Sequence, residues 1–311
     1  MNLKDKKILV TGGAGFVGTH LQKKLIERGV DQSNIFIPRR KDNDLRIWNN
    51  CLKAVKDIDV IIHLAVIVGG IEFNRQFPGD LYYDNIMMNT QIMEAARLEG
   101  VEKFVGIGSV CAYPKFTPVP FKEKNLWDGY PEETNAPYGL AKKMMLVQAQ
   151  AYRQQHNFNA IYLLPVNLYG PNDNFHPKYS HVIPGLIEKF VKAKHSLGDK
   201  DVIVWGTGKA SREFLYVEDC AEAIVLATEK YNKPDPVNIG SGREIKIKDL
   251  VKLIAKITDF HGQIIWDKSK SDGQPRRGLD VSKAEKEFGF KASTALEEGL
   301  KKTIEWYRNT L

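Results

Sequence analysis

The chain has 311 residues, of which 43% are hydrophobic and 27% charged, the composition of an ordinary globular protein with one large or two small domains. No apolar run approaches the roughly 20 residues that a membrane-spanning helix needs, and the polar first residues lack a signal-peptide core, so we expect a cytoplasmic protein without membrane contact. The net charge of +7 is spread along the chain, which fits phosphate-bearing ligands better than nucleic acid, and we expect no nucleic-acid partner.

Strand and helix patterns alternate through the first part of the chain. Short apolar runs predict strands over 7–12, 35–38, 60–65, 104–108 and 160–164, and helical spacing predicts helices over 20–28, 84–98 and 137–155. Continuous apolar strands of this kind are typical of a parallel sheet that is covered on both faces.

The pattern changes after residue 171. We predict a polar loop over 172–180, helices over 182–193, 248–257 and 295–308, strands over 202–205 and 213–217, and a strand over 237–240 that returns to the first sheet. The expected fold class is α/β, with a Rossmann-type doubly wound parallel sheet and a smaller α/β C-terminal substrate domain. The nucleotide-binding domain is expected over 1–170, with return segments near 213–220 and 237–242, and the substrate domain mostly over 171–311.

Glycines follow the first predicted strand at three evenly spaced positions. Gly12, Gly15 and Gly18 form a G-x-x-G-x-x-G pattern between a strand and a helix. This context indicates dinucleotide binding, because glycines let the backbone approach a pyrophosphate at a helix N-terminus. A tight turn without a ligand is the alternative.

The second predicted strand ends in a basic turn. Arg39 and Arg40 stand where a protein that binds NAD has an acidic residue for the ribose 2′-hydroxyl. Arginine there accommodates a 2′-phosphate, so we predict NADP(H) as the cofactor. An exposed basic turn without a ligand is the alternative.

Two further segments of the chain carry acid–base groups. Ser109 and Cys111 follow the strand over 104–108, and Tyr138 and Lys142 lie on the helix over 137–155. Residues i and i+4 share a helix face, so Lys142 can favour the phenolate of Tyr138 and tune it as a proton donor. The thiol adds an acid–base group that plain carbonyl reduction does not require. Alternatively, Cys111 is a small buried hydrophobic residue and the Tyr–Lys pair is solvated.

The remaining cysteines carry no pattern. Cys51 and Cys220 are widely spaced and the total is odd, so we expect neither a disulfide framework nor a metal site. His63, at the end of its strand, is interpreted as structural.

At Ser109, Tyr138 and Lys142 the chain resembles the extended short-chain dehydrogenase/reductase superfamily, and more specifically the GDP-L-fucose synthase family. The segments that carry the likeness are 68–71, 108–114, 167–175, 180–184, 204–208 and 212–214. Val110, Ala112 and Val166 depart from the family pattern, which weakens the choice of sugar. Alternatives are a reductase or epimerase for another GDP-linked 4-keto-6-deoxy sugar such as a heptose, an NAD-dependent nucleotide-sugar epimerase or dehydratase, and a non-catalytic NADP-binding protein.

The resemblance implies roles for the acid–base residues. Tyr138 donates a proton as a hydride from NADPH reaches the 4-keto carbon, and Ser109 hydrogen-bonds the keto oxygen. Lys142 lowers the pKa of Tyr138 and contacts the nicotinamide ribose. Cys111 and His181 act as base and acid in epimerising the two carbons beside the ketone. The implied activity is the conversion of GDP-4-keto-6-deoxy-D-mannose to GDP-L-fucose.

The resemblance also implies binding residues. The cofactor-binding set is Gly12, Gly15, Phe16, Val17, Gly18, Arg39, Arg40, Leu64, Ala65, Lys142, Pro165, Asn167, Leu168 and His181. The substrate-binding set is Asn167, Lys189, Trp205 and Arg212, with Arg212 at the diphosphate.

We also expect a homodimer. Two predicted helices carry apolar residues on more than one face, among them Met87, Met88, Ile92, Met144, Met145 and Val147. A two-fold pairing of the helices over 84–98 and 137–155 would bury that surface, as in members of the superfamily that the chain resembles.

Overall fold

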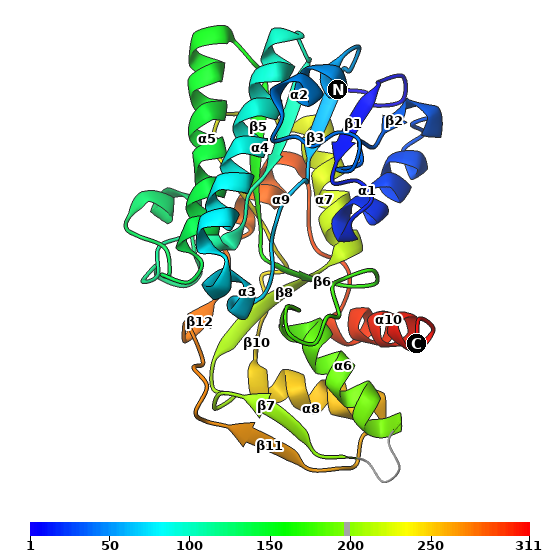
Figure 1. Ribbon diagram of the computed structural model, residues 1–311, viewed down its shortest axis with the longest axis vertical. Helices are drawn as coiled ribbons and strands as arrows, with labels where there is room; N and C mark the ends of the chain where they lie inside the picture. The colour runs from blue at the N-terminus through cyan, green and yellow to red at the C-terminus, as the bar shows by residue number, and fades with distance from the viewer. Residues whose placement is uncertain (196–199) are drawn as a thin grey trace.

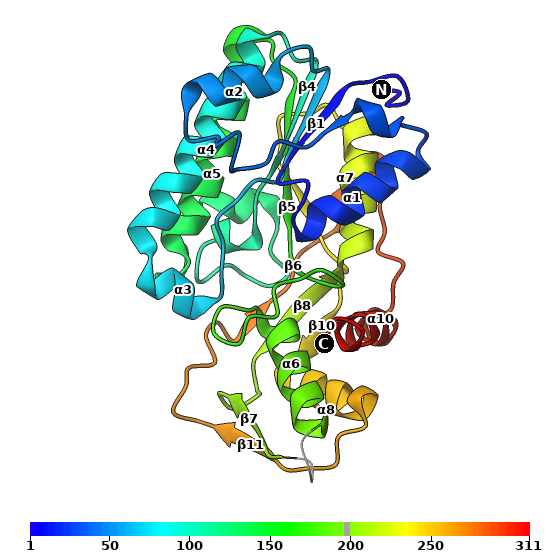
Figure 2. The same ribbon diagram turned by 45° about the vertical axis from the view of Figure 1, so that its right-hand side comes forward.

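The computed structural model describes residues 1–195 and 200–311 of the chain. A larger part is built around a six-stranded sheet, and a smaller part below it carries the C-terminal helix (Figure 1). The view in Figure 2 shows several connections between the two parts.

All six strands of the large sheet are parallel, in the order β2-β1-β3-β4-β5-β9. They are β1 (Ile8–Thr11), β2 (Ile35–Phe36), β3 (Val60–His63), β4 (Lys103–Ile107), β5 (Ala160–Pro165) and β9 (Val237–Ile239). The strand order reverses between β1 and β3. Ligands of doubly wound sheets bind at such a reversal, outside the carboxyl ends of the strands.

Helices cover both faces of this sheet (Figures 1 and 2). One face carries α1 (Phe16–Glu27) and α7 (Val217–Lys230), and the other carries α2 (Trp48–Val55), α4 (Pro78–Leu98) and α5 (Ala136–His156). The shorter elements are the helices α3 (Ile71–Gln76) and α9 (Ser282–Phe288) and the 3₁₀ turns Gln32–Asn34, Val110–Ala112 and Glu123–Trp127. Within the described ranges, no helix is long and apolar enough to cross a membrane.

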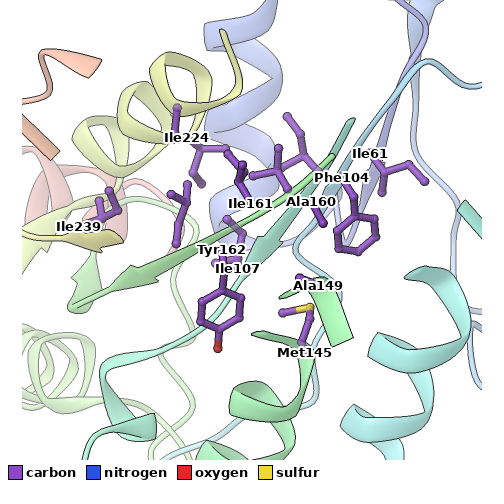
Figure 3. Close-up of a cluster of buried hydrophobic side chains, with 14 of the residues drawn as sticks. Ile61, Phe104, Ile107, Met145, Ala149, Ala160, Ile161, Tyr162, Ile224 and Ile239 are labelled. Atoms are coloured by element: carbon purple, nitrogen blue, oxygen red, sulfur yellow. The ribbon is translucent and has the colours of Figure 1, made fainter. Parts of the chain in front are cut away.

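The core of the larger part lies on both sides of β5 (Figure 3). Ile161 lies on the side of Ile224 from α7, whereas the next residue, Tyr162, lies on the side of Met145 and Ala149 from α5. Alternate residues of a strand point to opposite faces, so a sheet covered twice requires apolar residues at both. All five are at most 3% exposed. This burial explains the uninterrupted apolar runs of the sequence.

The smaller part has two sheets and its own core. One sheet contains β6 (Asn167–Tyr169), β8 (Ser211–Tyr216), β10 (Glu244–Lys246) and β12 (Arg276–Arg277), and the other pairs β7 (Val202–Trp205) with β11 (Ile264–Asp267). The helices are α6 (Val182–His195), α8 (Ile247–Thr258) and α10 (Leu296–Arg308).

The structure confirms the predicted fold class, and β9 joins the large sheet as its edge strand, as predicted. Other details differ from the prediction. The helices predicted over 20–28 and 84–98 begin earlier, at Phe16 and at Pro78. The helix α7 and the short elements α2, α3, α9, β6, β10, β11 and β12 were not predicted. In the segment near 213–220, β8 lies in the small sheet and α7 packs against α1 of the larger part. The domain boundaries, with their return segments, stay a prediction.

The surface offered for dimerisation is smaller than the sequence suggested. Met88, Ile92 and Met145 are at most 8% exposed and belong to the core of their own chain. Val147 remains 43% exposed on α5. The apolar face of these helices is therefore used mainly by their own sheet.

Candidate active site

The turn between β1 and α1 requires glycine for space. Gly12 has a φ of +67°, and a Cβ there would lie 2.8 Å from the backbone nitrogen of Ala65. A Cβ on Gly18 would overlap the backbone of Gly13. Gly15 is the N-cap of α1, and the helix has neither a side-chain cap nor an acidic residue in its first turn. Its first amide groups are therefore available to an anion.

The predicted cofactor residues lie along the carboxyl ends of the strands. Phe16 and Val17 begin α1, and Ala65, preceded by Leu64, contacts the glycine turn after β3. Pro165 ends β5, and Asn167 and Leu168 lie in β6. The backbone amide of Leu64 donates a hydrogen bond of 3.1 Å to Thr11 O. The fold thus brings segments from three strands to one edge.

The basic turn after β2 is open to solvent. Arg39 and Arg40 are both exposed, and Arg40 Nε lies 4.0 Å from Asp44 Oδ2. Among the residues that the structure describes, Arg39 has no ion-pair partner. Two arginines at this position suit a 2′-phosphate on a bound dinucleotide.

Ser109 and Cys111 lie in a tight turn at the end of β4. The amide of Cys111 donates to Ser109 Oγ at 3.2 Å, which holds the hydroxyl over the turn Val110–Ala112. A Cβ on Gly139 would overlap the carbonyl oxygen of Cys111, so the first turn of α5 packs directly on this turn. Tyr138 therefore comes beside the Ser109 and Cys111 side chains.

Tyr138 is held in its protonated form. Its side chain is 8% exposed. Burial raises the pKa of its phenol well above the ordinary value, a negative charge on Cys111 raises it further, and the Ser109 hydroxyl acts in the opposite direction. A phenol in this state can donate a proton at neutral pH.

Lys142 lies one helical turn after Tyr138 on α5. It is 2% exposed, and burial lowers its pKa to about 7. Within the protein, the group that lowers the pKa of Tyr138 is the Ser109 hydroxyl. The lowering of the Tyr138 pKa by Lys142 stays a prediction.

The backbone of Lys142 is fixed by a residue that the sequence did not indicate. The Tyr162 hydroxyl donates a hydrogen bond of 2.8 Å to the Lys142 carbonyl oxygen. Figure 3 shows the ring of Tyr162 extending from β5 towards α5. A Cβ on Gly108 would overlap this hydroxyl, so glycine is required there. The Gly–Ser segment and the Tyr–Lys helix are thus joined through Tyr162.

The cap brings two arginines to the thiol. Arg277 of β12 and Arg212 of β8 are direct partners in the small sheet. The Arg277 guanidinium donates to Cys111 Sγ at 3.7 Å. Arg212 donates to Ser211 O and Asp272 O, and its pKa is lowered to about 10, first by burial and then by the charge of Arg277. Sequence reasoning missed Arg277, whose only signal was the Arg–Arg pair in a short segment.

The other predicted cap residues occupy separate positions. His181 directly precedes α6 and part of its surface is exposed to solvent. Desolvation of its imidazole by the surrounding protein lowers its pKa. Lys189 donates to Ile203 O at 2.8 Å and lies over the exposed ring of Trp205. Asn167 donates to Glu213 O at 2.9 Å. Among the described residues, no hydrogen bond joins His181 to Cys111, so the geometry does not bring this pair together directly.

Comparison with known proteins agrees with this arrangement. Residues 8–240 match the NAD dependent epimerase/dehydratase family. A probable GDP-L-fucose synthase 1 from Oryza sativa subsp. japonica is 40% identical, over 98% of this chain and 92% of that protein. No group of acidic, histidine and cysteine side chains in the described part of the chain could hold a metal ion.

Solved structures agree over the whole chain. A GDP-6-OMe-4-keto-L-xylo-heptose reductase from C. jejuni has a TM-score of 0.92 at 27% identity, covering 99% of both chains. A GDP-L-fucose synthetase from Naegleria fowleri, bound to NADP, has a TM-score of 0.88 at 28% identity and covers 99% of this chain and 95% of that one.

Proposed function

Because the chain belongs to the NAD dependent epimerase/dehydratase family, we propose that it is an NADPH-dependent enzyme that epimerises and reduces a GDP-linked 4-keto-6-deoxy sugar. The substrate is GDP-4-keto-6-deoxy-D-mannose and the product is GDP-L-fucose. The observation that carries this proposal is the meeting of Ser109, Cys111 and Tyr138 beside a cationic group, Arg277. Plain reduction requires the hydroxyl and the phenol, but it has no use for the thiol.

The glycine turn fits NADP(H). A Cβ on Gly12 or Gly18 would collide with the backbone of Ala65 or Gly13, so glycine keeps the turn tight, and the uncapped start of α1 favours a pyrophosphate. Arg39 and Arg40 would hold the 2′-phosphate, and Lys142 the nicotinamide ribose. NADPH, when bound, supplies the hydride for reduction of the 4-ketone.

The reduction uses the buried phenol as its acid. Tyr138 donates its proton to the keto oxygen as the alcohol forms, and burial favours the protonated form that this step requires. Ser109 donates a hydrogen bond to the same oxygen. Lys142, with a pKa of about 7, can then return a proton to the phenolate.

The epimerisation uses the same keto oxygen. Cys111 removes a proton from a carbon beside the ketone, and the electron pair moves to that oxygen, where Ser109 and Tyr138 stabilise the negative charge. His181 returns a proton on the opposite face of the sugar, because an imidazole can act as a general acid.

The cap supplies the binding residues for the nucleotide. Arg212 pairs with the diphosphate, since a guanidinium is well matched to phosphate oxygens. Trp205 is 57% exposed and offers its ring for stacking against the substrate. The Lys189 ammonium nitrogen lies 5.5 Å from the centre of that ring. Asn167 lies in β6, between the two parts of the molecule.

The enzyme works as a homodimer in the cytoplasm. Tyr83, Leu98 and Val147 leave 59%, 54% and 43% of their surfaces exposed on α4 and α5, which supports a pairing of these helices about a two-fold axis. The three cysteines are free thiols, which suits a reducing compartment.

A second candidate substrate is another GDP-linked 4-keto-6-deoxy sugar, such as a heptose. It is favoured by the close structural likeness to the heptose reductase and by Val110, Ala112 and Val166, which depart from the fucose synthase pattern. Purified protein should be incubated with NADPH and GDP-4-keto-6-deoxy-D-mannose, and the sugar product identified. GDP-L-fucose is expected. No consumption of this substrate, with turnover of the heptose analogue, would favour the second candidate.

A further inference from the structure

We propose that Arg277 is the charge partner that holds Cys111 as a thiolate, and that Gln274 orients Arg277 for this task. This inference rests on the proposed epimerase function, in which the thiol removes a proton. A thiolate is the reactive form of cysteine, and a neighbouring cation stabilises it. The resemblance made Cys111 a base, but the sequence identified no cation beside it.

The contact between the two residues is direct. One guanidinium nitrogen of Arg277 lies 3.7 Å from Cys111 Sγ, within hydrogen-bonding distance for sulfur. The residues are far apart in sequence and come from β12 and from the turn after β4. The contact therefore depends on the docking of the cap against the larger part.

The other nitrogens of Arg277 are held by a neutral group. Arg277 Nε and its second terminal nitrogen donate to Gln274 Oε1 at 2.9 and 2.6 Å. Gln274 is itself 8% exposed, and its Nε2 donates to Lys115 O at 2.6 Å. That bond fixes which end of the amide faces Arg277. The guanidinium is thus aimed at the sulfur by a buried, directional chain of hydrogen bonds.

The charge of Arg277 is not neutralised within the described residues. Its sequence neighbour Arg276 pairs with Glu244 at 2.7 Å, whereas Arg277 has no carboxylate partner. The carboxylate of Asp272 accepts hydrogen bonds from Thr207, and its charge acts on Arg212. Within the described part of the chain, no carboxylate therefore competes with the sulfur as an ion-pair partner of Arg277.

Groups from three elements lie at or near the thiol. Arg277 from β12 donates to it, Tyr138 from α5 lies beside it and is kept neutral by burial, and Arg212 from β8 is the sheet partner of Arg277. When Cys111 removes a proton from the carbon beside the ketone, the S–H bond forms, the C–H bond breaks, and the electron pair moves to the keto oxygen. Arg277 keeps its own proton throughout.

The first test measures the thiol without any substrate. Alkylation of Cys111 by iodoacetamide is followed by peptide mass spectrometry as a function of pH. Cys51 and Cys220 do not interfere, because they are buried and burial raises the pKa of each to about 12. We expect Arg277→Gln to slow alkylation at neutral pH by roughly ten- to hundredfold and to move its midpoint to higher pH, since a charge-assisted contact is lost. Arg277→Lys should restore much of the rate.

Matched variants separate charge from structure. Arg276→Gln removes the neighbouring, exposed guanidinium and should leave the profile unchanged. Gln274→Ala keeps the charge but releases its orientation, so a smaller shift in the same direction is expected, and this variant serves if Arg277→Gln does not fold. An unchanged alkylation profile in folded Arg277→Gln would overturn the proposal. An unchanged profile together with a higher KM would mean that Arg277 only binds substrate, and it would overturn the proposal equally.

A second readout connects the charge to the reaction. With GDP-4-keto-6-deoxy-D-mannose in heavy water, Arg277→Gln should slow deuterium exchange beside the ketone more than it slows NADPH oxidation with a pre-epimerised substrate. If Arg277→Gln slows alkylation of Cys111 but the parent enzyme exchanges no deuterium, the charge partnership stands and the epimerase function is wrong. If the parent exchanges deuterium and Arg277→Gln does so at the same rate, the partnership is wrong.

Discussion

His63 Nδ1 lies 2.7 Å from the hydroxyl oxygen of Thr11, so the third strand of the sheet is tied to the residue just before the glycine turn. The opposite nitrogen of His63 lies 2.9 Å from Asn89 Oδ1, and the Asn89 amide donates to Ala141 O on α5. Because Asn89 presents its oxygen, His63 Nε2 must carry the proton and Nδ1 must accept from Thr11. A buried chain of hydrogen bonds thus connects the cofactor turn with the helix that carries Lys142.

The stability of the protein should depend on the titration of His63. Burial, followed by the charge of Lys142, lowers the pKa of His63 from 6.5 to about 3. Between these values the unfolded chain binds the proton and the native chain does not, so the free energy of unfolding falls as the pH falls from 6.5 towards 3, by up to about 5 kcal/mol. Urea unfolding of the parent and of His63→Gln at pH 7, 5.5 and 4.5 should give a flatter pH dependence for the variant. Parallel curves would contradict this role.

Tyr138→Phe should remove reduction and leave NADPH binding nearly unchanged. The ring stays in place, but the transferable proton is gone, and general acid catalysis is typically worth about 10²–10⁴-fold. NADPH oxidation under single-turnover conditions measures the step, and cofactor fluorescence measures binding. A fall of less than tenfold would rule out Tyr138 as the donor.

Arg39→Ala combined with Arg40→Ala should weaken NADPH binding by roughly ten- to hundredfold and NADH binding little. The reason is that only NADPH carries the 2′-phosphate, and a charge-assisted contact is worth about 1.5–3 kcal/mol. Titration of both cofactors gives the two dissociation constants, with NADH as the internal control. Equal losses for both would show that the arginines do not read the phosphate.

A substitution on α5 should separate the dimer. Light scattering of the parent should give twice the 35.2 kDa mass of one chain, and Val147→Glu should give a single chain. Ile265→Glu on β11 is the matched control, because Ile265 and Val147 are each 43% exposed. A monomeric parent, or a dimer that survives Val147→Glu, would mean that these helices are not the interface.

Much of the fold could be predicted because burial leaves a periodic trace in the sequence. The strands of the large sheet are apolar on both faces, as Ile161 and Tyr162 illustrate, and Gly12 and Gly18 mark positions without room for a side chain. The strands β7 and β8 could be predicted because most of their buried positions are likewise apolar. Short elements such as β12 escaped, because two adjacent arginines carry no periodic signal.

The site was predictable only where chemistry follows local spacing. Tyr138 and Lys142 share one helix, so their placement one turn apart could be predicted from the sequence. Arg277 reaches Cys111 across the two parts of the molecule, and Tyr162 reaches the Lys142 carbonyl across the sheet. Such contacts depend on tertiary packing. The lowered pKa of Lys142 is likewise a product of burial, which spacing does not reveal.

The central claim is that this site both epimerises and reduces, and solvent deuterium tests it most directly. The parent enzyme should be incubated in heavy water with unlabelled NADPH and GDP-4-keto-6-deoxy-D-mannose, and deuterium located in the product by NMR. We expect deuterium at C3 and C5, its loss in Cys111→Ala, and slow or incomplete epimerisation in His181→Ala. A reduced product without solvent deuterium from the parent enzyme would contradict the account, because Cys111 would then only pack in the turn after β4 and the enzyme would be a plain 4-ketoreductase.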